Sequence, residues 1–354
     1  MSDQAPIKAV AMLSGGLDSS IALHLIKSQG IEVEAVNFHT GFCLTDAHRA
    51  LGKTANKNGT PYRNEALRAG AHEQIPVRVV DVSRDYLPVV TKPKYGYGQA
   101  MNPCIDCRIF MLQRAKQIMD EIGARFVFTG EVLGQRPKSQ RRDTLRIIER
   151  DGGLDGRLLR PLSAKLLPPT IPERDGLVDR ERLEAISGRS RQRQMELARE
   201  LGLTDWPQPA GGCCYLTDEN FSRKFFDILD SREAAGRERR LEREDILLLS
   251  TGRHFRLSPR AKLIVGRTEV ENVLLEQHLA GRARLEVKDL PGPVALVEGE
   301  PTWEERQLAA RIVARYGKGR ERSEVVVEWR EGDLVEHYPV APEQDEALIE
   351  SLRR

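Results

Sequence analysis

Short apolar runs alternate with amphipathic stretches through the first half of the chain. Runs rich in aliphatic and β-branched residues predict four strands, at residues 7–13, 31–38, 76–82 and 124–129. Apolar residues at helical spacing predict helices between them, at residues 19–28 and 104–122. Strands that alternate with helices indicate a parallel sheet with helices on both faces, and ligands of such sheets bind beyond the carboxyl ends of the strands. Four residues fall at those ends: Ser14, Phe38, Asp81 and Gly130.

The second half of the chain has a different pattern, which begins near Ile246. Strand-like runs are expected at residues 257–267, from Glu298 onward and at residues 323–329. Helices are expected between these runs, at residues 268–279 and 303–316. This mixture predicts a smaller α+β domain that follows the α/β domain.

The region between the two patterns is irregular. Residues 166–172 break regular structure, helical patterns resume at 179–186 and 189–201, and residues 207–212 have the composition of a loop. For a chain of 354 residues we therefore expect three parts. They are an α/β domain over residues 1–205, a cysteine-bearing connecting segment over 206–245, and the α+β domain over 246–354.

A glycine-rich turn follows the first predicted strand. Residues 14–19 read Ser-Gly-Gly-Leu-Asp-Ser, and the first predicted helix begins at their end. Glycines let backbone N–H groups approach oxygen anions closely, and the start of a helix adds partial positive charge. The turn is therefore expected to bind phosphate. It lacks the Gly-Lys-Ser/Thr ending of the P-loop NTPases and the GxGxxG spacing of dinucleotide-binding folds.

Five cysteines indicate metal or redox chemistry, because an odd number argues against a disulfide framework. They are Cys43, Cys104, Cys107, Cys213 and Cys214. Cys104 and Cys107 open a predicted helix, so their thiols lie on one face, and the helix start favours the thiolate form.

Two pairs of cysteines are compatible with a four-thiolate zinc site, but the side chains of adjacent cysteines diverge and seldom reach one metal ion. A site of three thiolates, from Cys104, Cys107 and Cys213, is therefore favoured over a site of four. Three ligands on a cubane iron–sulfur cluster leave one iron open to bind a sulfide. Inert cysteines are the alternative, which is favoured for Cys43 and also weighed for Cys214.

The composition permits a substantial core and gives no sign of a membrane protein. The hydrophobic fraction is 40%, yet no run of about 18 apolar residues exists and no basic segment precedes an apolar core at the N-terminus. We therefore expect a cytoplasmic protein.

Arginines gather in one segment although the formal net charge is only +2. The segment contains Arg136, Lys138, Arg141, Arg142, Arg146 and Arg150. Arginine-rich patches suit contacts with phosphate groups, so we favour a nucleic-acid interface here over a solvated helix face.

Four motifs together resemble one family. They are SGGLDSS at residues 14–20, NPCIDC at 102–107, TGE at 129–131, and AGGC at 210–213 followed by LTD at 216–218. In combination they are similar to the tRNA thiouridine synthetases and tRNA 2-thiouridylases, a branch of the N-type ATP pyrophosphatases or PP-loop proteins. The matching segments cover most of residues 7–230. The resemblance implies a fold of the adenine nucleotide alpha hydrolase type.

The resemblance also implies a reaction. ATP activates a carbonyl oxygen of a tRNA base as an adenylate, and a sulfur nucleophile then displaces AMP. Members of this family use either a persulfide relay on paired cysteines or a [4Fe–4S] cluster on three cysteines, and the sequence leaves this choice open.

Roles are carried over to this chain motif by motif. The pyrophosphate would be held by Ser14, Gly15, Gly16, Asp18 and Ser19, and Gly130 would lie against the nucleotide. Asp18 is also expected to bind Mg²⁺ or to orient the substrate. The catalytic and metal-binding thiols would be Cys104, Cys107 and Cys213. Contacts with tRNA phosphates are expected from Arg136, Lys138, Arg141 and Arg142.

The predicted C-terminal domain resembles the small RNA-binding module of NFACT-type proteins. The resemblance is carried by KLIVGR at residues 262–267 and by Glu271-Asn272. It implies that this domain binds tRNA. The alternative is a generic α+β domain that serves packing or the formation of a homodimer. Because the turn begins at residue 14 and no cysteine follows Cys214, we expect neither the tRNA-binding domains that precede the core of the fuller 4-thiouridine synthetases nor a sulfur-carrying extension with its own cysteine. Sulfur is therefore expected as free sulfide or from an external cysteine desulfurase or persulfide carrier.

Two other functions compete with tRNA thiolation. An amidating PP-loop pyrophosphatase that acts on a small molecule would keep the glycine turn but would not need the cysteines or the arginine cluster. An RNA-binding protein with a relic nucleotide site would not catalyse any exchange between ATP and pyrophosphate.

Overall fold

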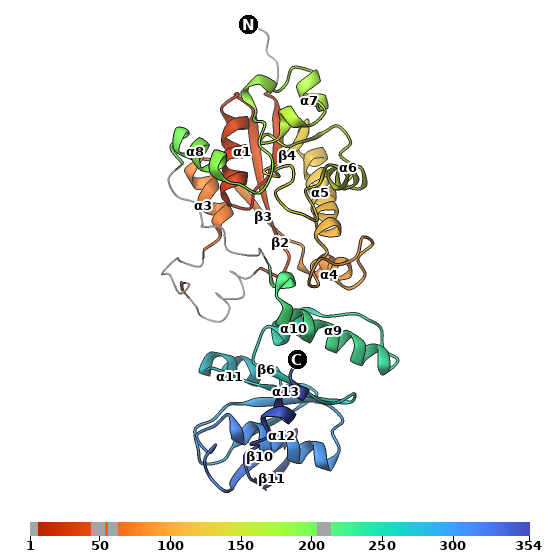
Figure 1. Ribbon diagram of the computed structural model, residues 1–354, viewed down its shortest axis with the longest axis vertical. Coiled ribbons are helices and arrows are strands. Elements are labelled where there is room, and N and C mark those ends of the chain that lie inside the picture. Colours follow the sequence, from red (N-terminus) through yellow and green to blue (C-terminus); the bar gives the residue numbers. More distant parts are fainter. Residues whose placement is uncertain (1–5, 44–53, 56–62, 204–213) are drawn as a thin grey trace. The chain divides into compact units, whose positions relative to one another are not determined.

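The computed structural model describes residues 6–43, 54–55, 63–203 and 214–354. The chain forms two compact units, and the boundary between them falls between Thr217 and Asp218 (Figure 1). That boundary lies inside the expected connecting segment 206–245. The three-part division into residues 1–205, 206–245 and 246–354 stays a prediction.

A parallel five-stranded sheet forms the centre of the first unit. Its strands are β1 (Lys8–Met12), β2 (Glu32–His39), β3 (Val77–Asp81), β4 (Phe126–Thr129) and β5 (Leu158–Leu159). They pair in the order β3-β2-β1-β4-β5, and every pair is parallel. The four strands expected from the apolar runs are confirmed. The edge strand β5 was missed because a run of two residues has no periodicity to detect.

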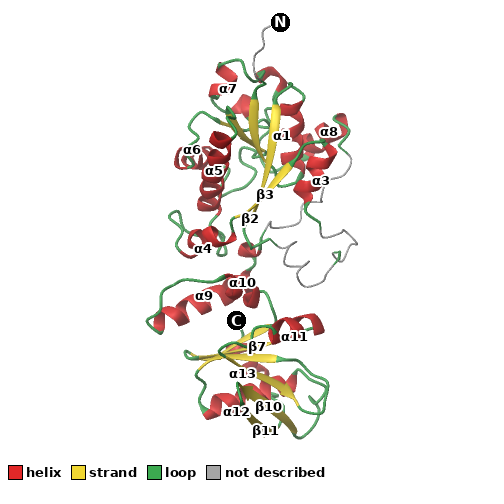
Figure 2. Ribbon diagram, turned by 180° about the vertical axis from the view of Figure 1, so that it is seen from behind, coloured by secondary structure: helices red, strands yellow, loops and turns green. Residues whose placement is uncertain are grey.

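Helices cover both faces of this sheet (Figure 2). Ala9 and Ala11 of β1 pack in one apolar cluster with α1 (Leu17–Lys27) and α3 (Glu65–His72). Val10, which points to the opposite face, packs in a second cluster with α5 (Cys104–Glu121) and α6 (Arg142–Asp151). The predicted α/β architecture is therefore confirmed. The remaining helices of this unit are α4 (Ser83–Thr91), α7 (Ile171–Arg174) and α8 (Gln192–Glu200), with 3₁₀ turns at Ala164–Leu166, Arg180–Arg182 and Tyr215–Thr217.

One expected helix of the first unit is wrong. Residues 179–186 form only the 3₁₀ turn Arg180–Arg182, after which the chain is extended. The backbone N–H groups of Glu184 and Ile186 donate hydrogen bonds to the carbonyl oxygens of Pro161 and Leu162, at 2.9 and 2.8 Å. These bonds to a distant segment replace the bonds within a helix that the apolar spacing had suggested.

The second unit contains a six-stranded antiparallel sheet. Its strands are β6 (Arg253–Ser258), β7 (Ala261–Val265), β8 (Arg282–Val287), β9 (Ala295–Gly299), β10 (Val325–Glu331) and β11 (Leu334–Val340), in the order β11-β10-β8-β9-β7-β6. The helices are α9 (Glu219–Ala234), α10 (Arg243–Leu249), α11 (Glu269–Glu276), α12 (Trp303–Arg315) and α13 (Glu346–Leu352). The predicted α+β class is confirmed, but the single run expected at 257–267 is a hairpin formed by parts of β6 and β7.

Two apolar clusters hold the second sheet between helices. One cluster packs α12 and Ile349 of α13 against inward-facing residues that include Phe255 and Trp329. A smaller cluster on Ile264 and Leu296 packs α10 through Leu248 and α11 through Leu275. None of the helices among the described residues combines the length and the apolarity that crossing a bilayer would need.

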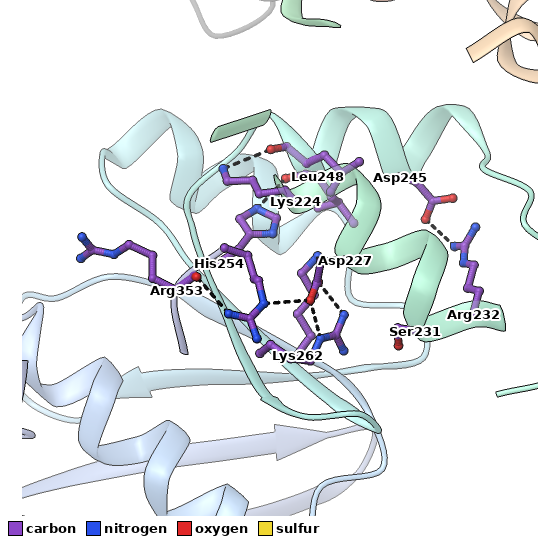
Figure 3. A network of polar contacts seen from close by, with 12 residues as sticks. Lys224, Asp227, Ser231, Arg232, Asp245, Leu248, His254, Lys262 and Arg353 are labelled. Carbon is purple, nitrogen blue, oxygen red and sulfur yellow. Dashed lines mark hydrogen bonds and ion pairs between the residues drawn. The ribbon is translucent and has the colours of Figure 1, made fainter. Parts of the chain in front are cut away.

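Helix α9 is joined to this sheet by polar contacts (Figure 3). The Asp227 carboxylate accepts two hydrogen bonds from the Arg256 guanidinium, at 2.9 and 2.6 Å, and lies 3.4 Å from Lys262 Nζ. Arg354 Nε also donates to this carboxylate, at 3.2 Å. Lys224 Nζ donates to the carbonyl oxygens of Leu249 and Gly252, at 3.2 Å each. These contacts explain why α9 belongs to the second unit.

Candidate nucleotide and thiol site

The glycine turn lies between β1 and the start of α1. Gly15 has φ = +75°, and a Cβ atom at this position would lie 2.0–2.4 Å from the backbone of Glu65 and Ala66. Only glycine fits there. Gly16 caps α1 without any side-chain acceptor, and the Ser19 and Ser20 hydroxyls donate to the Gly16 carbonyl at 2.9 and 3.1 Å. The first N–H groups of the helix therefore present an anion site without a competing cap.

Gly130 joins the end of β4 to the start of α1. A Cβ atom on Gly130 would lie 2.5 Å from the Ser19 nitrogen and 2.6 Å from the Asp18 carbonyl carbon. The absence of a side chain thus lets the two backbones pack directly. The expectation that Gly130 lies against a nucleotide stays a prediction. What the structure adds is that Gly130 fixes the helix start at the point between β1 and β4 where the strand order reverses.

Asp18 is a largely buried carboxylate, and one of its two oxygens accepts a hydrogen bond. Its Oδ2 atom accepts a hydrogen bond from Gln135 Nε2 at 3.0 Å and lies 3.8 Å from Arg191 Nη2. Burial raises the pKa of Asp18, while Gln135 and Arg191 oppose this shift. The Oδ1 atom is buried and has no hydrogen-bond partner among the described residues. A buried carboxylate oxygen beside a phosphate site fits a hard cation such as Mg²⁺.

The Cys-x-x-Cys pair begins helix α5, as predicted, and each of its two thiols has a side-chain neighbour. Asn102 Nδ2 donates a hydrogen bond to Cys104 Sγ at 3.0 Å. The buried Tyr86 hydroxyl, from α4, is hydrogen-bonded to Cys107. Burial raises the pKa of Tyr86 well above its ordinary value, with a further contribution from Cys107 and smaller ones from Cys214 and Cys104. Three cysteines therefore lie within electrostatic reach of one hydroxyl group.

Cys43 and Cys214 form an antiparallel bridge next to this group. The neighbouring Phe42 is fully buried, and its ring meets the Tyr86 ring edge-on at 5.9 Å between centroids. Phe110 of α5 contacts the same Tyr86 ring at 5.7 Å. Inert cysteines were the alternative for Cys43 and Cys214, yet the fold brings both toward the Cys-x-x-Cys pair. Cys213, the expected third thiol, lies outside the described residues.

A chain of charged side chains holds the thiols at the same end of the sheet as the glycine turn. Arg108, which follows Cys107, places its Nε atom 3.5 Å from Glu131 Oε1. Glu131 follows Gly130 directly, and its Oε2 atom lies 3.2 Å from Arg160 Nε, which follows β5. The start of α5 is therefore fixed at the carboxyl ends of β4 and β5.

Sequence reasoning gave no role to Asn102, Tyr86 or Arg108. Asn102 and Arg108 flank the Cys-x-x-Cys motif directly, so their positions were a usable signal. Tyr86 offered none, because it lies 21 positions before Cys107.

The residues expected to contact tRNA have different surroundings. Arg136 is close enough to Asp18 to lower the pKa of that carboxyl, and Lys138 Nζ donates to the Gly96 carbonyl at 3.1 Å. Arg141 caps α6 and is exposed. Arg142 lines a cavity of about 280 Å³ on the β5 side of the sheet. Three more arginines share its wall: Arg146, Arg160 and Arg174.

Among the described residues, no group of three histidine, cysteine or carboxylate side chains is arranged to hold a metal ion. Two of the three expected ligands of an iron–sulfur cluster, Cys104 and Cys107, lie one helical turn apart at the start of α5. This pair fits two corners of such a cluster.

Family comparisons agree with the two resemblances. Residues 5–165 match the family model described as "Thiamine biosynthesis protein (ThiI)". These residues are named the ThiI-type domain after this match. Residues 252–353 match the "NFACT protein RNA binding domain". The ThiI-type domain contains the glycine turn, the Cys-x-x-Cys helix and Gly130.

Several curated proteins are similar to part of this chain. A "Probable tRNA sulfurtransferase" from Lysinibacillus sphaericus is 28% identical over 210 residues, which are 59% of this chain and 42% of that protein. A "Bifunctional protein NifU/MnmA" from Rubrobacter xylanophilus is 32% identical over 155 residues, 39% of this chain and 29% of that protein. The chain thus spans less than half the length of these relatives.

Solved structures resemble the chain only distantly. The U34-tRNA thiolase NcsA from Methanococcus maripaludis, with its [4Fe-4S] cluster, is 18% identical, with coverage of 69% of this chain and 71% of that one and a TM-score of 0.32. A 4-thiouridine synthetase in complex with RNA and ATP is 22% identical, covers 55% of this chain and 51% of that one, and has a TM-score of 0.30. Structural similarity with TM-scores this low supports no conclusion about function.

Proposed function

We propose that this protein is an ATP-dependent tRNA sulfurtransferase, which adenylates a carbonyl oxygen of a tRNA base and replaces that oxygen with sulfur. One observation carries the proposal. The glycine turn and the Cys-x-x-Cys helix start share the carboxyl end of one parallel sheet, and Gly130, Glu131 and Arg108 connect them. The ThiI-type match and the relatives named as tRNA sulfurtransferases support the same assignment.

The phosphate end of the site binds and orients ATP. The backbone N–H groups at the start of α1 bind the pyrophosphate portion, assisted by Ser14 and Ser19, whose hydroxyls lie 3.1 Å apart. Donors that are fixed before the reaction stabilise the charge that develops on the leaving group. Asp18 would hold Mg²⁺ through its unpartnered Oδ1 atom, and that cation would neutralise further phosphate charge.

The thiol end of the site delivers sulfur to the activated base. Cys104 and Cys107, with Cys213 as the proposed third thiolate, would hold a [4Fe–4S] cluster that supplies an iron position for sulfide. The other route is a persulfide on one of these cysteines. In both routes Asn102 and Tyr86 orient the two sulfurs of α5 through hydrogen bonds. Free sulfide would supply the cluster, whereas the persulfide would take its outer sulfur from an external desulfurase or persulfide carrier, because sulfide and a thiol form a persulfide only with an oxidant.

The RNA is bound through positive charge in both units. The NFACT-type domain supplies a general grip, and Arg136, Lys138, Arg141 and Arg142 contact phosphates near the site. Binding that depends on phosphate contacts weakens steeply as the salt concentration rises.

Exchange between ATP and pyrophosphate, with and without tRNA, tests the adenylation step. We expect exchange that depends on tRNA, and a thionucleotide in the digested RNA when sulfide is added. Asp18→Asn lowers exchange by roughly 10²-fold, because the variant loses the buried carboxylate charge. Asp143→Asn, at an exposed position of α6, serves as the matched control.

Cys104→Ser distinguishes the adenylation step from the sulfur-transfer step. This variant should retain exchange but form no thionucleotide. Full activity of Cys104→Ser on a small molecule would favour the amidating pyrophosphatase instead. A protein that catalyses no exchange under any of these conditions would leave only the RNA-binding alternative. Iron and sulfide content after anaerobic purification then decides between the cluster and the persulfide.

A further inference from the structure

Cys43 and Cys214 face each other across a short antiparallel bridge. The Tyr215 N–H group donates to the Phe42 carbonyl oxygen at 3.0 Å. This hydrogen bond joins the neighbours of the two cysteines, so Cys43 and Cys214 form a non-hydrogen-bonded pair. In an antiparallel ladder this is the pairing in which opposite Cα atoms come closest, at about 4.5 Å. Disulfides form at Cα separations of about 4.4–6.8 Å. This type of pairing thus has a Cα separation within the range in which disulfides form.

The surroundings keep the pair in place and leave it accessible. Both cysteines are half-buried, so a small reagent can reach them. Phe42 is fully buried against Tyr86, which anchors the segment that carries Cys43. On the other strand, Cys214 lies within electrostatic reach of the Tyr86 hydroxyl, which is itself hydrogen-bonded to Cys107. The cysteine pair is therefore a neighbour of the Cys-x-x-Cys thiols.

We propose that Cys43 and Cys214 form a reversible disulfide, which makes Cys43 a further sulfur-handling residue of this site. The disulfide follows from the local geometry alone. Its effect on catalysis rests on the proposed function: the bond fixes Cys214, which follows the proposed third thiolate Cys213 in sequence, and sulfur transfer stops until a thiol reduces the bond.

Thiol–disulfide exchange with a small disulfide such as oxidised glutathione forms the bond. The Cys214 thiolate attacks one glutathione sulfur and releases one glutathione thiolate, which leaves glutathione bound to Cys214. The Cys43 thiolate then attacks Cys214 Sγ and releases the second glutathione. Two protein thiols are oxidised and one glutathione disulfide is reduced. The two protons of the protein thiols end on the two glutathione thiols.

Peptide mapping after treatment with oxidised glutathione tests the disulfide. The full chain carries Cys213→Ser in this experiment, so that the neighbouring cysteine cannot be confused with Cys214. We expect a peptide in which Cys43 is linked to Cys214, with no glutathione retained on either residue. Adding Cys43→Ser should instead leave glutathione bound to Cys214. Adding Cys104→Ser, the matched control, should leave the Cys43–Cys214 link unchanged.

Three results would overturn the proposal. Glutathione that stays bound to Cys43 or Cys214 without a link between them, or a link from Cys214 to Cys104 or Cys107, rejects the disulfide. Unchanged thiolation of tRNA by fully linked wild-type protein, measured against the same sample after reduction with dithiothreitol, rejects the effect on catalysis. Reduced wild-type protein that does not thiolate RNA rejects the proposed function, while the peptide map still decides the disulfide.

Discussion

The side-chain amide of Asn102 donates a hydrogen bond to the sulfur of Cys104, with Nδ2 3.0 Å from Sγ. Its Oδ1 atom accepts from the Ala100 backbone at 3.3 Å, which fixes the orientation of the amide. Because Cys104 is also the first residue of α5, its sulfur lies beside both this donor and the first N–H groups of the helix.

Asn102→Asp should therefore slow the chemistry of Cys104. The substitution keeps the acceptor for Ala100 but replaces the donor with a carboxylate that repels a thiolate. We expect alkylation of Cys104 by iodoacetamide at neutral pH to slow by roughly tenfold, the equivalent of one charge-assisted hydrogen bond. Mass spectrometry of the alkylated peptide gives the rate. Asn220→Asp, on an exposed position of α9, is the control, and an equal rate in both variants would show that Asn102 does not act on the sulfur.

The two glycines of the phosphate turn should differ in their tolerance of a methyl group. Gly15→Ala places Cβ 2.0–2.4 Å from the backbone near Glu65 at a φ of +75°, whereas Gly16→Ala brings Cβ no closer than 3.6 Å to the Ser14 hydroxyl. We expect Gly15→Ala to lower the free energy of unfolding by more than about 2 kcal/mol, and Gly16→Ala by less than about 1 kcal/mol. Urea unfolding of the full chain measures both, and similar losses would contradict the described turn.

Contiguous features of this protein could be predicted from its sequence, and features assembled from distant segments could not. The strands β1 to β4 are contiguous segments with continuous or alternating apolar residues, and the glycine turn is one hexapeptide. Tyr86, by contrast, reaches Cys107 only because α4 packs against α5, and Cys43 meets Cys214 across 171 positions of sequence. The helix expected at 179–186 failed for the same reason, since Pro161 and Leu162 supply its hydrogen-bond acceptors.

Lys224 should give the second unit a distinctive pH dependence. Burial, with Arg267 and Lys262 nearby, lowers the pKa of Lys224 from 10.5 to about 7. Between these two values the unfolded chain binds a proton that the folded chain does not, so stability rises as the pH increases through this window. The full effect is on the order of 5 kcal/mol.

Lys224→Met removes the titrating group but keeps the aliphatic stem. We expect the stability of the second unit to rise less between pH 7 and pH 10 in this variant than in the wild type, as followed by thermal unfolding. Lys318→Met, at an exposed position, should retain the wild-type slope. Equal slopes in all three proteins would mean that Lys224 titrates normally.

The place where the second unit begins can be tested with two fragments. Residues 218–354 contain Asp227, whose carboxylate faces Arg256, Arg354 and the buried Lys262 Nζ, whereas residues 246–354 leave these cations without it. Loss of one partner from a buried ion pair costs about 3–5 kcal/mol, so we expect the longer fragment to unfold cooperatively in urea and the shorter one to be much less stable. Asp227→Asn in the longer fragment should reproduce most of this loss. Asp230→Asn, on the same helix but 67% exposed, should not. Equal midpoints of urea unfolding for the two fragments would place the start of the folded unit near residue 246. They would show that α9 does not stabilise this unit.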